Sequence, residues 1–145
     1  MRLLVAALVL VVPTAAAAAT PTTWATAVVS PSVVAHRATL TLKLHFRMQC
    51  GKPGPGPVTI DLPPKMHTQP SLAVRIGSTP AAAKVSGDHV TVQLPRQHGI
   101  TCMVIGPGTL VLALAGVRNP ASPGRYVVRA HLRDMDFTAR LAVRA

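Results

Sequence analysis

Acidic side chains are nearly absent from this sequence of 145 residues. It contains no glutamate, and its only carboxylate side chains are Asp61, Asp88, Asp134 and Asp136, against 15 lysines and arginines. This scarcity disfavours catalysis by a pair of carboxylates, and it also disfavours calcium sites built from several carboxylates. The formal net charge of +11 instead favours anionic partners.

Aromatic residues and catalytic motifs are also scarce. Aromatic side chains make up 3% of the chain, which argues against a base-stacking surface for single-stranded nucleic acid. The signatures of helix-turn-helix, zinc-finger and RNA-binding domains are missing. So are the G-x-S-x-G, H-E-x-x-H and phosphate-binding glycine motifs of common enzymes. The sequence therefore predicts no enzymatic activity, no cofactor and no specific recognition of nucleic acid.

The longest apolar run lies at the N-terminus. Met1 and Arg2 give a positive start, residues 3–12 are continuously apolar, and residues 15–19 are alanines suited to cleavage. This order is typical of a secretory signal peptide, and the run is short for a membrane span, which needs about 20 residues. We expect cleavage of residues 1–19, leaving residues 20–145 as one secreted or extracytoplasmic domain without a transmembrane span. An uncleaved N-terminal anchor is the alternative.

Cys50 and Cys102 are the only cysteines. An even pair in an exported chain predicts one disulfide. It would close a loop of about 50 residues, for which the chain-entropy model gives about 4 kcal/mol of stabilisation. Free thiols that bind metal or perform redox chemistry are the alternative, but the sequence has no C-x-x-C motif.

Apolar and polar residues alternate in short segments separated by glycine and proline. In residues 39–50, for example, Leu40, Leu42 and Leu44 share one face, and Lys43 lies on the other. Period two is the pattern of a half-buried strand. Further strands are expected at residues 58–62, 72–76, 83–85, 90–94, 100–104, 110–115, 126–132 and 137–143. The pattern predicts an all-β fold, an antiparallel immunoglobulin-like β-sandwich of about eight strands, in which the apolar segment 110–115 is central.

Six short segments carry strand and turn markers in a fixed order. They are residues 58–63 (VTIDLP), 74–77 (VRIG), 90–92 (VTV), 107–110 (PGTL), 116–120 (GVRNP) and 124–126 (GRY). In this order the chain resembles the immunoglobulin-like modules of surface proteins from Gram-positive bacteria and archaea. The resemblance implies a turn at Asn119-Pro120 and Gly124, and a strand starting near Tyr126. It also implies a non-catalytic structural or adhesive module at the cell envelope.

Basic residues fall on the polar faces of several expected strands. The set of interest is Lys43, Arg47, Arg129, Arg133, Arg140 and Arg144. If the strand at residues 39–50 shared a sheet with the final hairpin, these side chains would form one cationic face. Such a surface would attract anionic cell-envelope polymers or lipid headgroups. A merely solvated basic surface is the alternative, and the sequence does not indicate an oligomeric state.

A copper site is the alternative function. Thioether and imidazole ligands suit copper in an exported protein, and Met66, His67 and Met103 are the candidate ligands. His45 and Met48 are worse placed, because residues three apart on a strand point to opposite faces. The sequence thus favours a small secreted binding or structural module of the envelope over an extracytoplasmic copper protein.

Overall fold

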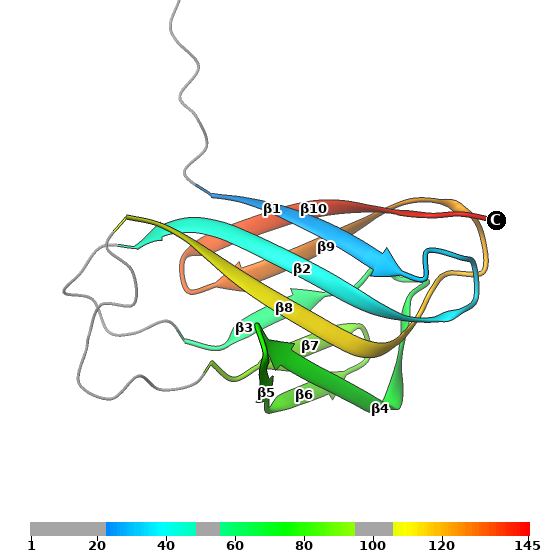
Figure 1. Cartoon of the computed structure of the whole chain (residues 1–145), viewed down its shortest axis with the longest axis horizontal. Helices are drawn as coiled ribbons and strands as arrows, with labels where there is room; N and C mark the ends of the chain where they lie inside the picture. Colours follow the sequence, from blue (N-terminus) through cyan, green and yellow to red (C-terminus); the bar gives the residue numbers. More distant parts are fainter. Residues whose placement is uncertain (1–22, 49–55, 95–105) are drawn as a thin grey trace, which may run out of the picture.

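The computed structural model describes residues 23–48, 56–94 and 106–145. They form two antiparallel sheets of five strands each, packed face to face (Figure 1). The strand order is β1-β2-β8-β4-β5 in the first sheet and β10-β9-β3-β7-β6 in the second sheet. The predicted all-β antiparallel sandwich is confirmed, with ten strands among the described residues instead of about eight.

The strands have the following bounds. The first sheet contains β1 (Trp24–Ser30), β2 (Arg37–Met48), β8 (Gly106–Arg118), β4 (His67–Ile76) and β5 (Thr79–Ala81). The second sheet contains β10 (Met135–Val143), β9 (Gly124–Leu132), β3 (Val58–Asp61), β7 (His89–Val92) and β6 (Ala83–Ser86). The strand expected at residues 100–104 lies outside the described residues, as do the expected signal peptide and both cysteines.

The core lies between the two sheets and follows the period-two pattern of the sequence. Leu40, Leu42 and Leu44 of β2 are at most 1% exposed, and so are Leu112 and Leu114 of β8. They face the buried side chains of the second sheet, Val58, Ile60, Val90, Val92, Val128, Ala130, Leu132, Phe137, Ala139, Leu141 and Val143. The position of β8 between β2 and β4 confirms that the apolar segment 110–115 is central.

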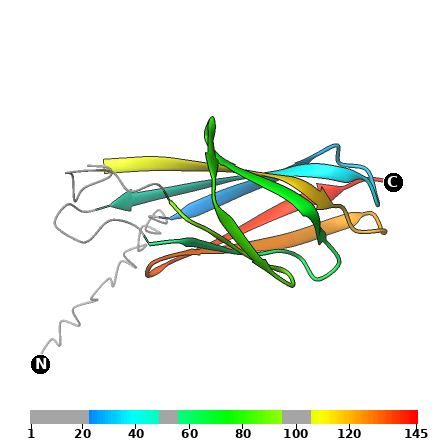
Figure 2. The same ribbon diagram turned by 90° about the horizontal axis from the view of Figure 1, so that it is seen from below.

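The chain changes sheets between β5 and β6. Only Ala82 separates the two strands, yet β5 belongs to the first sheet and β6 to the second. Figure 2 shows this segment in green, passing from one layer to the other at the edge of the sandwich. The opposite edge is lined by β1 and β10, which pack against each other across the layers.

The glycine of the GVRNP segment allows a close approach between strands. Gly116 has φ +101°, a conformation that L-residues with a side chain rarely adopt. A Cβ at this position would lie 3.2 Å from the backbone oxygen of Ser71 and 3.3 Å from the Cα of Leu72. The β2–β8 ladder also shifts here, pairing Val117 and Ala115 with consecutive residues of β2. The glycine therefore forms a bulge at which β4 comes close to β8.

The rest of this segment holds the β1–β2 connection. Arg118 donates from Nε to the Ala35 carbonyl at 2.9 Å. The Asn119 amide donates to the carbonyls of Pro31 and Val33, both at 2.8 Å, and this side chain is 2% exposed. The motif that carries the family resemblance thus has a structural role, because it joins the end of β8 to a distant loop.

Tyr126 fixes the start of β9. Its hydroxyl donates to the Ser122 carbonyl four residues upstream, at 2.7 Å. A tyrosine at the start of a strand that bonds back to the preceding corner is the tyrosine corner of immunoglobulin-like domains. The strand that the resemblance implies near Tyr126 is present, but it begins two residues earlier, at Gly124, which therefore belongs to β9 and not to the turn.

We expect Tyr126→Phe to lower the free energy of unfolding by about 1 kcal/mol, because it removes this hydrogen bond and leaves the ring in place. Urea unfolding followed by far-ultraviolet circular dichroism measures the change. An unchanged midpoint would show that the corner does not stabilise the fold.

Candidate functional site

The basic residues expected from the sequence lie on opposite sides of the sandwich. Lys43 points outward from β2 in the first sheet, whereas Arg129 and Arg140 point outward from β9 and β10 in the second sheet. The strand that carries Lys43 and the final hairpin therefore do not share a sheet, and the expected single cationic face does not form. Arg133 lies in the β9–β10 turn with φ +58°, and the side chain of Arg47 lies outside the described part of the chain.

Four arginines form a strip on the outer face of the second sheet. Arg125 and Arg129 lie on β9, Arg140 lies on the adjacent β10, and Arg144 follows β10 directly. All four are exposed, and Arg129 and Arg140 each lie between two buried residues. We call these four residues the arginine strip. The sequence prediction did not include Arg125, although its spacing of four residues from Arg129 already places both on one strand face.

Among the described residues, no side-chain hydrogen bond or ion pair engages the guanidinium groups of the strip. The ion pairs among the described residues all join a histidine to an aspartate, so no described arginine or lysine is paired with a carboxylate. The described hydrogen bonds do engage three arginines of the other sheet. Arg37 donates to Ser71, Arg75 to the Ser78 carbonyl and Arg118 to the Ala35 carbonyl. Within the described residues, the strip guanidinium groups therefore remain available to an external anion.

Histidines and aspartates meet at one end of the strip. His131 of β9 donates from Nδ1 to Asp136 of β10 at 2.5 Å, and its Nε2 lies 3.5 Å from Asp61 of β3. His89 of β7 donates from Nδ1 to the same Asp61 at 2.6 Å, and its Nε2 lies 3.3 Å from Asp88. We call these five residues the imidazole–carboxylate cluster. It uses three of the four aspartates of the sequence.

The cluster favours the protonated form of His89. The hydrogen bond to Asp61, and then the negative charge of Asp88, raise the pKa of His89 above its ordinary value of 6.5. Because folding raises this pKa, protonation of His89 stabilises the fold below the unfolded pKa. That contribution is lost as the pH rises through the folded pKa.

We expect Asp61→Asn to lower the pKa of His89, because it removes the carboxylate that accepts the histidine's hydrogen bond. Titration of the imidazole resonances by NMR measures this pKa. Asp134→Asn is the matched control, since it removes the same charge from a residue outside the cluster. An unchanged titration of His89 in Asp61→Asn would contradict the hydrogen bond.

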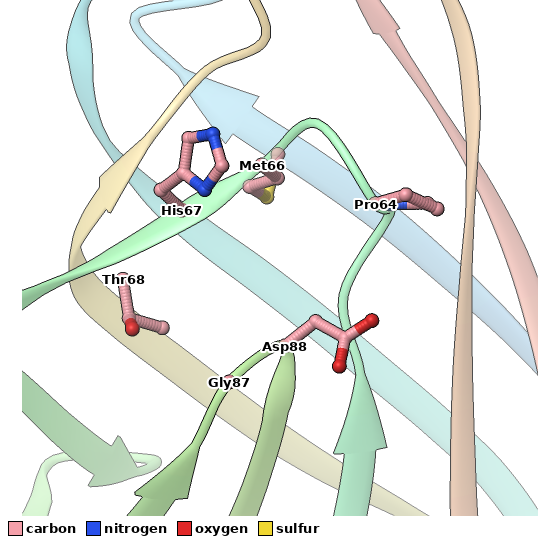
Figure 3. A pocket seen from close by; sticks show the side chains of 6 residues that line it. All are labelled: Pro64, Met66, His67, Thr68, Gly87 and Asp88. Carbon is pink, nitrogen blue, oxygen red and sulfur yellow. The ribbon is translucent and has the colours of Figure 1, made fainter.

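The structure gives no support to the copper alternative. Met66 is 1% exposed and belongs to the hydrophobic core, whereas its neighbour His67 is exposed. Both line a surface pocket with Asp88, in which the His67 ring and the Asp88 carboxylate point away from each other (Figure 3). Met103 lies outside the described residues. Among the residues that are described, no group of three or more His, Cys, Asp or Glu side chains could hold a metal ion.

Comparison with known proteins shows the fold and no more. No protein-family model matches the sequence, and no curated protein is significantly similar to it. Among solved structures, the chain is similar to BslA, described as a bacterial hydrophobin, with 16% identity and a TM-score of 0.58. The match covers 84% of this chain and 98% of BslA. The fold is a two-sheet antiparallel β-sandwich.

Two further structures are similar at lower TM-scores. An immunoglobulin-like protein from Nocardia farcinica is 11% identical with a TM-score of 0.43, over 84% of this chain and 99% of that one. A non-cellulosomal cohesin from Archaeoglobus fulgidus is 10% identical with a TM-score of 0.46, over 83% and 91%. In the described part of the chain, no helix has the length and apolar character needed to span a bilayer.

Proposed function

We propose that this protein is a small secreted, non-catalytic immunoglobulin-like module of the cell envelope that binds anionic polymers or lipid headgroups through its basic surface. The observation that carries the proposal is the arginine strip, four exposed guanidinium groups without a protein partner among the described residues. Guanidinium groups form paired, charge-assisted hydrogen bonds with phosphate and carboxylate oxygens. A row of them on a rigid sheet therefore suits a repeated anion.

The proposal includes export and the Cys50–Cys102 disulfide. Met48 and Gly106 are partners in the β2–β8 ladder, so the two strands are adjacent where they approach the cysteines. Cys50 follows Met48 by two residues, and Cys102 precedes Gly106 by four. Such short tethers allow the two Cα atoms to come within the roughly 4–7 Å that a disulfide requires. Mass spectrometry of the exported protein under non-reducing conditions tests the linkage.

Binding to defined anions tests the function. The mature protein should bind long-chain inorganic polyphosphate or phosphatidylglycerol vesicles at low ionic strength, and added salt should weaken this binding, because the attraction is electrostatic. Neutral dextran and phosphatidylcholine vesicles are the matched controls. Failure to bind either anionic probe at low ionic strength would overturn the proposal.

A further inference from the structure

The outer face of the second sheet combines a binding surface with a proton-sensitive element. Taking the proposed function as its basis, we infer that the arginine strip binds a linear polymer of phosphate groups, and that acidification strengthens this binding through the imidazole–carboxylate cluster.

The four arginines of the strip are regularly spaced along β9 and β10. Arg125 and Arg129 are four residues apart on β9, which corresponds to about 13 Å. Arg140 on β10 lies opposite Val127, halfway between them, and Arg144 continues the row beyond Arg125. From strand geometry, successive Cα atoms along the zigzag Arg144, Arg125, Arg140 and Arg129 are about 8 Å apart. Evenly spaced guanidinium groups suit a polymer with a charge on every repeat better than a single compact anion.

The same face has little apolar surface for membrane insertion. Of the four exposed large hydrophobic side chains among the described residues, only Val127 lies on the outer face of the second sheet. Peripheral binding to a bilayer usually adds apolar insertion to electrostatic attraction. A soluble, extended polyanion is therefore the better match, and lipid headgroups become an outcome of the test.

The cluster lies directly beside the strip. Arg129 and His131 are two residues apart on the same face of β9, and Asp61 of β3 lies opposite Arg129. The Asp61 carboxylate nevertheless contacts His89 and His131 and forms no ion pair with Arg129. Among the described residues, Arg129 therefore has no ion-pair partner. The three carboxylates of the cluster lie at the Arg129 end of the arginine strip, where a bound polyanion would come close to them.

Protonation of His89 adds one positive charge to this end of the strip. That charge lies 2.6 Å from the carboxylate of Asp61 and 3.3 Å from that of Asp88, so it offsets part of the negative charge of the cluster. Repulsion of a polyanion is therefore strongest above the imidazole titration range and weakest below it.

Carboxylates face both histidines of the cluster. The carboxylates facing His131 are Asp61 and Asp136, and Arg129 lies beside it on its own strand. The carboxylates facing His89 are Asp61 and Asp88, and the nearby cation on the same face is Lys84 of β6. The raised pKa of His89 agrees with this balance of charges.

Polyphosphate is the appropriate probe, because its internal phosphates stay ionised while His89 titrates. We expect the mature protein to bind it on the order of tenfold more tightly at about pH 5.5 than at about pH 8, at constant low ionic strength. The double variant His89→Gln/His131→Gln should lose most of this difference and keep the weaker binding at both pH values. Its matched control is His36→Gln/His45→Gln, which removes His45 of β2 and His36 just before β2, away from the second sheet, and should keep the difference.

The outcomes separate this inference from the proposed function. If neither polyphosphate nor phosphatidylglycerol vesicles bind at either pH, the proposed function itself fails. Binding whose pH dependence survives in His89→Gln/His131→Gln would overturn the regulation and leave the function intact. Binding to the vesicles without binding to polyphosphate would overturn the polymer as the ligand.

Discussion

The double variant Arg129→Glu/Arg140→Glu is expected to bind polyphosphate on the order of a hundredfold more weakly than the unchanged protein at low ionic strength. It replaces two positive charges at the centre of the arginine strip with negative ones. Both side chains are exposed, and within the described ranges neither forms an ion pair, so the sandwich should remain folded. Calorimetry at about pH 5.5, where binding is expected to be strongest, measures the affinity.

The matched control is Lys43→Glu/Arg75→Glu on the outer face of the first sheet. It changes the net charge of the protein by the same amount, but the altered side chains point away from the strip. We expect a much smaller loss of affinity. Equal losses in the two double variants would mean that binding follows the net charge of the molecule, and the strip would not be its site.

The variant Asn119→Asp is expected to lower the free energy of unfolding by about 3 kcal/mol. The two side chains have nearly the same shape, so packing is preserved. The Asn119 amide donates two hydrogen bonds to the carbonyls of Pro31 and Val33, and a carboxylate cannot donate them. It would also place a negative charge against two carbonyl oxygens at a site that is 2% exposed.

Urea unfolding at neutral pH measures this loss. Arg118→Gln is the neighbouring control, because it removes one exposed hydrogen bond to the Ala35 carbonyl without burying a charge. Its expected cost is about 1 kcal/mol. If Asn119→Asp lowered the free energy of unfolding no more than Arg118→Gln does, the Asn119 amide would not be what stabilises the β1–β2 connection.

Long alternating segments could be recognised from the sequence, whereas short edge strands could not. In β2, apolar and polar side chains alternate over residues 38–48, so the buried face is evident; β9 and β10 keep this alternation except at Val127 and Ala142, which are apolar and face outward. In β1 only Ala27 and Val29 are buried, while Val28 and Trp24 are apolar and exposed, which hides the alternation. In β5, Pro80 predicts a turn from the sequence. The structure accommodates it in a strand, because β5 lies at the edge of its sheet, where a proline is tolerated.

The candidate site was only partly predictable. Alternation shows that Arg129 and Arg140 face outward, but it does not show which sheet a strand joins, because that depends on long-range pairing. The sequence therefore could not tell that Lys43 faces the opposite side. The imidazole–carboxylate cluster was missed for the same reason. Its members come from β3, β7, β9, β10 and the β6–β7 turn, and only the strand registers bring Asp61 next to His89 and His131.

The most direct test of the central claim is an NMR titration of the mature protein with polyphosphate, following the Nε–Hε resonances of its arginines. We expect the largest changes at Arg125, Arg129, Arg140 and Arg144, because these guanidinium groups would contact the phosphates. Changes confined to the first-sheet arginines Arg37, Arg75 and Arg118, or no changes at all, would contradict the assignment of the outer face of the second sheet as the anion-binding surface.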